Sequence, residues 1–552
     1  MASRTEEPPA AHDAPPAPHP RRWWALGALV AAMLVLGFDT TILNVALPTM
    51  AAELGAGTGR LQWIVDAYTV VFAALMLPAG LLGDRFGRRR MLVTGLGIFL
   101  AGSLLGTFAD SSALVVTARA VMGTGAALIM PLAMSVLPSL FGPAERSTAV
   151  GAISAASALG LPLGPLVGGW LLDHFWWGSV FLVNIPLALL GVAACVFLLP
   201  ETRDPASPRV DALSAGLTAS GLGALVFGVI EGPARGWLDP LVLTALTASA
   251  ALLTGLVLRG RGQQRPMLDL GLLRSRGFLW NTVAAALGTL VLSGLMFVLP
   301  PYLQAVLGHD ALGTGLRMLP MMAGLLIAAK GSGMLSARIG PRPVVTGGLI
   351  VLACAAFLGS RTDVHDGYGT TALWLSVAGV GFGFAMVPAM DAALGALPRE
   401  RAGSGSGLLM TVRQFGGALG VAVLGSLLAG AYGDRIVTAG LPGPAADAAG
   451  DSVVAAHLVA GRIGAPELAA SADRAYLDGM GLVLLVCGVA ALVAATLTAL
   501  FLPDTRTGRD AGTDGTGRTA AELSPDATSR PGPAGRPGTG TAVAAGTPDA
   551  RE

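Results

Sequence analysis

The chain has little charge. Only 12% of its 552 residues are Asp, Glu, Lys or Arg, whereas an ordinary globular protein carries about a quarter. Hydrophobic residues make up 53% of the sequence, and the mean hydropathy is +0.67. This balance excludes an ordinary soluble protein and indicates a chain that lies mostly in a lipid bilayer.

Several other features are scarce. The only lysine, Lys330, is followed by Gly331, so the chain has no phosphate-binding loop ending in Gly-Lys-Ser/Thr, and energy must come from an ion gradient. The six histidines fall in tails or loops without metal-ligand spacing, which argues against a metal centre or an enzyme. The net charge of +1 gives no sign of a nucleic-acid partner. No cofactor is expected, and no signalling domain is attached to either tail.

Long apolar runs are abundant. A helix needs about twenty residues to cross the hydrocarbon core, and we identify fourteen such runs. They cover approximately 24–48, 62–82, 91–109, 112–138, 147–171, 178–199, 211–230, 240–258, 278–303, 313–336, 343–359, 371–396, 404–430 and 477–502.

Arginine gives the orientation. Basic residues in short loops gather on the cytoplasmic side, and arginines cluster after the even-numbered spans, whereas the short loops on the other side hold only Arg60, Arg235 and Arg361. Both termini are therefore expected in the cytoplasm of a multi-pass plasma-membrane protein. The expected segments are a disordered tail 1–22, a six-helix bundle 23–200, two inserted helices and a linker 201–276, a six-helix bundle 277–502 with a long outer loop 431–476, and a disordered tail 503–552.

The two six-helix bundles carry an internal repeat. At a constant offset of 256, four glycines of the fifth span match four of the thirteenth; they are Gly151, Gly160, Gly164 and Gly169, and Gly407, Gly416, Gly420 and Gly425. Two repeated halves are common in transporters, where substrate lies at their interface near the midplane. Glycines can also serve only close helix packing, which is the simpler reading of the match.

These motifs resemble those of the major facilitator superfamily, and within it the fourteen-span drug/proton antiporters that include quaternary-ammonium and methyl-viologen exporters. Residues 39–48, DTTILNVALP, look like the family's first-span signature, and Arg119 with Gly123 and Gly125 is similar to its fourth-span motif for proton coupling. The resemblance covers all fourteen spans and implies an all-α membrane fold of two pseudo-symmetric six-helix bundles plus two inserted helices.

Two further motifs complete the resemblance. Residues 80–90, GLLGDRFGRRR, look like the superfamily's inner-loop motif, which implies a conformational latch made by Gly80, Asp84, Arg85, Gly87 and Arg88. A simple solvated loop is the alternative. The fifth span looks like the motif associated with antiporters rather than importers, carried by Gly160, Gly164, Pro165, Gly168 and Gly169.

Asp39 and Arg119 are charged residues inside predicted spans. From the helix rise, Asp39 lies roughly 13 Å and Arg119 roughly 10 Å below the outer ends of their helices, so they are at similar depth. A guanidinium favours the charged carboxylate and burial favours the neutral one, so the balance can swing as a cavity opens or closes. We expect Asp39 to carry the proton, or a substrate's positive charge, with Arg119 biasing proton release. A permanent ion pair that only joins two spans is the alternative.

Four other charged residues are candidates for substrate binding together with Asp39. Asp66 lies roughly 6–8 Å below the outer end of the second span, where solvation is the alternative, and Lys330, Asp391 and Arg413 lie roughly 12–17 Å from the inner ends of theirs. Lys330 could instead extend its amine to the interface, and Asp391 and Arg413 could form a structural pair.

The sequence therefore predicts a proton-coupled antiporter that exports lipophilic, cationic drugs or antibiotics. Its expected partners are a small molecule, protons and the bilayer, and it is expected to act as a monomer. A dedicated exporter of one secondary metabolite stays open, as does an importer.

Overall fold

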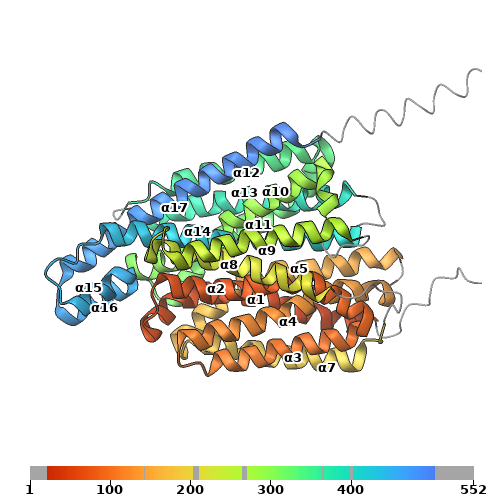
Figure 1. Ribbon diagram of the computed structural model, residues 1–552, viewed down its shortest axis with the longest axis horizontal. Coiled ribbons are helices and arrows are strands. Elements are labelled where there is room, and N and C mark those ends of the chain that lie inside the picture. Colours follow the sequence, from red (N-terminus) through yellow and green to blue (C-terminus); the bar gives the residue numbers. More distant parts are fainter. Residues whose placement is uncertain are drawn as a thin grey trace, which may run out of the picture. The chain divides into compact units, whose positions relative to one another are not determined.

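Every regular element in the described part of the chain is a helix. The computed structural model describes residues 22–141, 143–202, 211–263, 270–363, 366–397 and 402–503, so the predicted tails lie almost entirely outside it. A spanning segment must satisfy its own backbone hydrogen bonds in lipid, and a helix does so within one segment. The helices run alongside one another as a bundle (Figure 1).

The first half of the bundle is built from six successive spans, the last of them broken. Its helices are α1 Arg22–Leu54, α2 Thr58–Phe86, α3 Arg88–Thr107, α4 Ser112–Leu140, α5 Pro143–His174, and the pair α6 Ser179–Leu182 and α7 Asn184–Leu198. Pro186 has no N–H for the carbonyl of Leu182, which accounts for the break between α6 and α7. An ion pair between Arg22 and Glu145, 2.9 Å, joins the starts of α1 and α5.

The second half repeats the first. Its helices are α10 Arg276–Pro301 with a π-helical turn η2 Tyr302–Val306, α11 Ala311–Ile339, α12 Pro341–Gly359, α13 Tyr368–Gly395, α14 Ala402–Arg435 and α17 Pro466–Phe501, with a 3₁₀ turn η1 Leu270–Arg274 before them. Helix α1 packs on α5 and α7, and α10 packs on α14 and α17 in the same way. Likewise α4 packs on α2 and α3, and α13 on α11 and α12. The two halves predicted from the sequence repeat therefore also pack their helices in the same way.

Contacts between the halves obey the same symmetry. Helix α2 packs on α14, α5 packs on α11, and α1 meets α10. Helix α8, Ala212–Arg235, lies against both α2 and α14 and carries α9, Pro240–Gly262. The Ser249 hydroxyl of α9 donates to the Gly221 carbonyl of α8, 2.8 Å. The inserted pair therefore covers one of the two seams between the halves.

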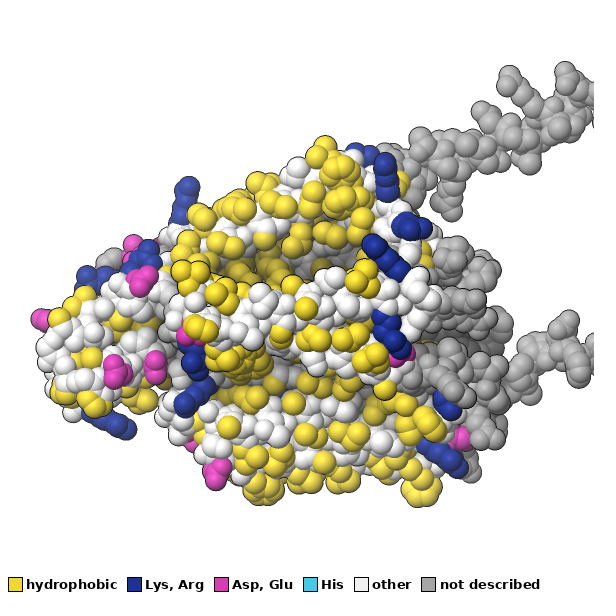
Figure 2. Space-filling view, viewed as in Figure 1, with side chains coloured by type: hydrophobic (Ala, Val, Ile, Leu, Met, Phe, Trp, Pro, Cys, Tyr) yellow, Lys and Arg dark blue, Asp and Glu magenta, His cyan; other side chains and the backbone are white. Residues whose placement is uncertain are grey.

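Twelve described helices are long and apolar enough to cross a membrane. The expected spans at 62–82 and 147–171 fall in α2 and α5, where some side chains are outside the described set, so a total of fourteen stays a prediction. Figure 2 shows charged side chains gathered toward the two ends of the bundle and a mostly hydrophobic and uncharged band between them.

The expected outer loop 431–476 contains two short helices, α15 Gly443–Asp451 and α16 Val453–Ile463, and the first turns of α17, which begins at Pro466. The two short helices lie together at one end of the bundle (Figure 1). We call this the predicted outer end, and the opposite one, where α1 begins, the predicted cytoplasmic end.

Asp211 fixes the start of the inserted pair at the predicted cytoplasmic end. It caps α8 by accepting from the backbone N–H of Leu213 and Ser214, 3.2 Å each, and it pairs with Arg259 of α9, 3.0 Å. Hydrogen bonding from Arg259, helped by the Ser214 hydroxyl, lowers the pKa of Asp211 below its usual 3.8.

Asp211→Ala is expected to destabilise the protein by about 1 kcal/mol, the usual cost of losing such a cap. Because the pKa is lowered in the folded state, this stability is present above pH 3.8 and is lost as the pH falls below it. Thermal melts of the two proteins should therefore differ by a constant amount from pH 8 to about 5 and converge only in stronger acid. Convergence already near pH 6 would contradict the assignment.

Candidate functional site

A cavity lies between the two halves of the bundle. Its volume is about 210 Å³, far more than the roughly 30 Å³ of a single water. Residues of α1, α2 and α4 line one side and residues of α10, α11, α13 and α14 the other. Of the described residues that line it, only Arg119 and Arg413 are charged, one from each half. This is where a substrate is expected in a two-repeat transporter.

The predicted meeting of Asp39 and Arg119 is present. Arg119 Nη1 lies 2.7 Å from Asp39 Oδ2, and the two side chains are 2% and 1% exposed. The other carboxylate oxygen, Oδ1, accepts from Asn184 Nδ2 at 3.0 Å. Arg119 lines the cavity, whereas Asp39 lies behind it. Arg119 therefore contacts both the cavity and the Asp39 carboxylate.

Arg119 is held by two further contacts from α2. Its Nε donates to the backbone carbonyl of Ile64, 3.3 Å, and its guanidinium lies 4.2 Å from the centre of the Tyr68 ring. An aromatic face attracts a cation at this distance. Four helices therefore orient the pair, because α1 supplies Asp39, α4 supplies Arg119, α7 supplies the Asn184 amide, and α2 supplies both the carbonyl and the ring.

Asp66 is buried rather than solvated. It is 0% exposed, and neither carboxylate oxygen has a hydrogen-bond partner among the described residues. Its neighbour Val65 lines the cavity, and one residue further along a helix the side chain turns by about 100°. Asp66 stands one helical turn from Gln62, which donates to α14, and from Val70, which clusters with residues of α8 and α14. Asp66 is therefore on the side of α2 that faces this seam and does not line the cavity, and its role in substrate binding stays a prediction.

Arg413 lines the cavity, but its suggested pair with Asp391 is not formed. Arg413 Nη1 instead donates to the Met390 sulfur, 3.5 Å, and its buried Nε has no partner among the described residues. Asp391 is exposed and does not line the cavity. Nine residues separate it from Phe382, which does, and this turns Asp391 about 180° around α13.

Lys330 is also outside the cavity lining, so its role in substrate binding stays a prediction. Its side chain is exposed, and it lies about 80° around α11 from Met322, which faces the cavity. Its exposed neighbours Ile327 and Met334 are apolar. The position fits the alternative in which the amine extends toward the interface.

The predicted latch meets a residue that sequence reasoning missed. Arg89 and Arg90 approach Glu201 at 3.7 and 3.6 Å, and the Arg89 N–H donates to the same carboxylate. Gly87 has φ +110° and faces this carboxylate so closely that a side chain would collide with it. Glu201 directly follows the sixth span, at the same side of the membrane as the arginines of residues 88–90. An acidic residue at that position was the signal in the sequence from which this contact could have been predicted.

Other latch residues are placed as follows. Arg88 Nη1 donates to the Ser135 carbonyl of α4, 2.9 Å. Arg85 is exposed beside Phe86, and Gly80 lies opposite Pro131 of α4. The side chain of Asp84 is outside the described set. The motif thus ties α2, α3, α4 and the end of α7 together within one half.

The glycines of the fifth span divide into two groups. A Cβ on Gly160 would lie 2.6 Å from the Gly37 carbonyl carbon, and a Cβ on Gly164 or Gly168 would collide with Thr41 or Ile42 of α1. Gly169 instead faces the other half, where a Cβ would lie 2.6 Å from the Ala311 carbonyl oxygen of α11. Pro165 sits at the same seam, its carbonyl against Gly315.

The repeated glycines divide in the same way. Gly416 and Gly420 press on Ala286 and Leu290 of α10, whereas Gly425 faces Gln62 of α2 in the opposite half. In each copy, two glycines therefore hold the span against the first helix of its own half, and the fourth matched glycine lets the halves approach.

Contacts between the halves lie toward the predicted outer end. Gln62 donates to the carbonyls of Val421 and Ala422, 3.0 and 2.9 Å, and Gln304 donates to that of Val45, 2.9 Å. Together with the Gly169 contact they shut the cavity off on that side. Sequence reasoning missed both glutamines; the only signal was an amide near the end of an apolar run.

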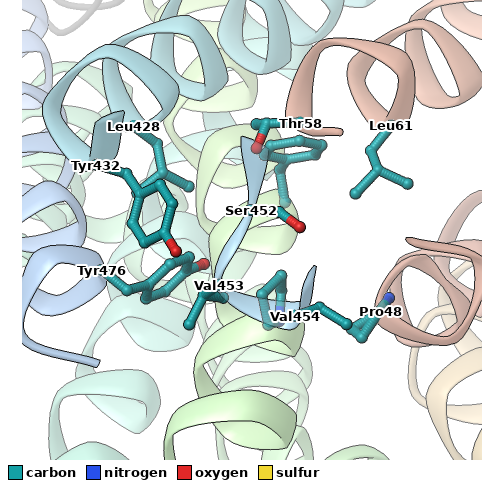
Figure 3. A pocket seen from close by; sticks show the side chains of 11 residues that line it. Pro48, Thr58, Leu61, Leu428, Tyr432, Ser452, Val453, Val454 and Tyr476 are labelled. Carbon is teal, nitrogen blue, oxygen red and sulfur yellow. The ribbon is translucent and has the colours of Figure 1, made fainter. Parts of the chain in front are cut away.

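The short helices α15 and α16 reinforce this closure. The Thr58 hydroxyl at the start of α2 donates to the Asp451 carbonyl, 3.0 Å, and the Tyr432 hydroxyl donates to that of Ala449, 2.9 Å. Figure 3 shows the small pocket that remains, of about 30 Å³, with Tyr432 and Tyr476 on one side and Pro48 on another. Both halves and the outer loop therefore contribute to the closed end.

Comparison with known proteins agrees with this architecture. Residues 29–421 match the family model of the Major Facilitator Superfamily. The chain is 32% identical to the tetracenomycin C resistance and export protein of Streptomyces glaucescens over 91% of this chain and 96% of that protein. It is 33% identical to the multidrug efflux pump LfrA of Mycolicibacterium smegmatis over 86% and 95%.

Solved structures share the fold. A bacterial homologue of the human lysosomal transporter Spinster, in an inward-facing and unoccupied conformation, matches with a TM-score of 0.64 at 18% identity, over 88% of this chain and 98% of that one. The helical bundle, its repeated halves and the sequence matches lead to one assignment. This multi-pass membrane protein belongs to the Major Facilitator Superfamily, and the relatives it resembles there are drug and antibiotic exporters.

Proposed function

We propose that this chain is a proton-coupled antiporter that exports lipophilic drugs or antibiotics across the plasma membrane, with both termini in the cytoplasm. It acts as a monomer on one small molecule at a time and needs no cofactor. The observation that carries the proposal is the buried pair of Asp39 and Arg119 beside the cavity between the halves. Both relatives described above are named for export or efflux.

The pair can hold or release a proton according to the position of Arg119. While Arg119 donates to Asp39, the carboxylate is charged and compensated. If Arg119 turns toward the cavity, Asn184 is the one described residue that still donates to Asp39, and a single charge within a bilayer is costly. Asp39 then takes up a proton. Because Arg119 contacts both the cavity and Asp39, an occupant of the cavity can govern this exchange.

Alternating access follows from the seams between the halves. In the structure the halves meet toward the predicted outer end, so the cavity is closed there and a proton leaves Asp39 toward the cytoplasm. Rocking of one half against the other would part α2 from α14 and α5 from α11 and open the cavity to the outside. Substrate then departs and Asp39 is protonated again.

A dedicated exporter of one secondary metabolite is the second candidate. The observation that favours it is the relative named for resistance to, and export of, a single antibiotic, which aligns with 91% of this chain. Both candidates use the same pair and cavity and differ in the range of compounds carried.

The proposal is tested in a host strain that lacks its own efflux pumps. Cells that express the chain should accumulate less of at least one compound in a panel of anionic, neutral and cationic fluorescent drugs. A protonophore should restore accumulation, and so should Asp39→Asn. Reduced accumulation that persists with the protonophore would contradict proton coupling. Increased accumulation, abolished by the protonophore, would identify an importer.

A further inference from the structure

The charge in the cavity is not balanced between the two halves. On the α4 side Arg119 is compensated by Asp39 at 2.7 Å. On the α14 side Arg413 has no carboxylate within ion-pair distance among the described residues. No described acidic side chain lines the cavity. An occupant therefore meets one surplus positive charge.

Arg413 keeps its donors available. Its one hydrogen bond to a described residue goes to a thioether sulfur, which is a weak acceptor. Arginine stays protonated in proteins and presents several N–H donors in a planar fork that suits carboxylates and similar anions. Gln414, the next residue, also lines the cavity and adds an amide.

The walls around Arg413 are apolar and adaptable. Met296, Met322, Leu325 and Phe382 line the cavity from the same half. Methionine fills irregular gaps and makes favourable contacts with aromatic rings, and Tyr68 faces them from the other half. The hydroxyls of Thr40, Thr69 and Ser293 are also at the cavity.

We propose that the cavity takes organic acids, with Arg413 binding the anionic group of a substrate whose flat apolar body packs against the methionines and Phe382. This inference rests on the proposed function and gives it a substrate class. It departs from the cationic substrate expected from the sequence, because that expectation needs a free charge on Asp39, and Arg119 compensates that charge in the structure.

Two dyes with one ring system test the substrate class. Sulforhodamine B has a net negative charge, and rhodamine B ethyl ester has the same diethylamino-substituted xanthene with a net positive charge. Fluorescence anisotropy with the purified full-length protein should show tighter binding of sulforhodamine B. Arg413→Gln should weaken that binding by at least about tenfold, as expected for a hydrogen bond to a charged group, and leave the ester unchanged or bound more tightly. Arg413→Lys should retain part of the preference.

Asp391→Asn is the matched control, because Asp391 is the residue next to Met390 and is exposed. It should leave both affinities unchanged. If it strengthens sulforhodamine B binding as strongly as Arg413→Gln weakens it, Asp391 compensates Arg413 in solution and the inference is wrong. Preference for the ester in the wild type, or equal effects of Arg413→Gln on both dyes, would also overturn it.

Further measurements distinguish a failure of this inference from a failure of the proposed function. Export of the ester but not of sulforhodamine B, driven by a pH gradient, would overturn the substrate class and leave proton-coupled export standing. Binding of sulforhodamine B with the expected dependence on Arg413, but transport that is insensitive to the gradient, would support the substrate class and contradict proton coupling. Loss of dye binding in nanodiscs of anionic rather than zwitterionic lipid would show that Arg413 holds a lipid headgroup, which contradicts a substrate role.

Discussion

Asp39→Asn is expected to abolish gradient-driven transport and to destabilise the protein. The substitution keeps the shape of the side chain but leaves the 2%-exposed Arg119 without a counter-charge. Removing one partner of a buried ion pair costs about 3–5 kcal/mol, because a single uncompensated charge remains in a low-dielectric interior. Thermal melts of the purified protein and transport in proteoliposomes measure the two effects.

A double variant that combines Asp39→Asn with Arg119→Met distinguishes a structural role of the pair from a role in proton coupling. The double variant has no buried charge at this position, so its melting temperature should return most of the way to that of the wild type. Transport should stay absent, since no group remains to exchange the proton. A double variant that recovers gradient-driven transport would show that the pair only joins the helices.

Glu231→Gln provides the matched control for charge removal. Glu231 pairs with Arg235 at 2.7 Å one turn along α8, and both side chains are partly exposed. Surface pairs of this kind contribute about 0–1 kcal/mol. Stability and transport should both remain near wild type.

Alanine substitutions at Gly160 and Gly169 should have different effects although both glycines belong to one motif: the first should lower stability, and the second should shift the conformational equilibrium. Gly160 lies against the backbone of α1 within one half, so the added methyl group has nowhere to go. Overpacking of this kind costs about 1–3 kcal/mol, and Gly160→Ala should lower the melting temperature. Gly169 lies against α11 of the other half. There the strain is relieved when the halves part at the predicted outer end, so Gly169→Ala should favour the outward-open state with little loss of stability.

Labelling from outside measures that shift. A cysteine introduced at Ser293, which lines the cavity, should react with a membrane-impermeant maleimide several times faster in Gly169→Ala, in a background without the three native cysteines. Gly223→Ala is the control, because no atom outside its own stretch of helix lies within 4 Å of its added Cβ. Equal labelling in Gly169→Ala and the control, together with a large loss of stability, would contradict the assignment of this seam to the moving interface.

The pairing of Asp39 with Arg119 could be predicted because it depends mainly on depth. The helix rise places both residues at nearly the same level below the outer surface, and an intramembrane charge needs a partner. Lys330, Asp391 and Asp66 do not line the cavity because of their direction around the helix. A helix that is apolar on all sides gives no amphipathic pattern to show which face points inward, so depth was known and orientation was not.

The fold could be predicted more completely than the site. Run length identifies the spans, and the spacing of the glycines identifies the repeat, since close helix approach leaves no room for a side chain. Asn184 and Gln62 were missed because a single amide in an apolar run has no pattern around it. The span predicted at 477–502 is shorter than α17, which begins at Pro466, because hydropathy reports only the part inside the membrane. Proline at the first helical position was the signal for that start.

The most direct test of proton coupling through Asp39 follows proton movement when a substrate is added. Inside-out vesicles are energised to an acid interior, a ΔpH dye is read, and an exported compound identified in cells is added. The account predicts proton efflux on addition to wild-type vesicles and none with Asp39→Asn, with equal amounts of inserted protein. Substrate-dependent proton movement that survives in Asp39→Asn would contradict the central claim that this carboxylate carries the proton.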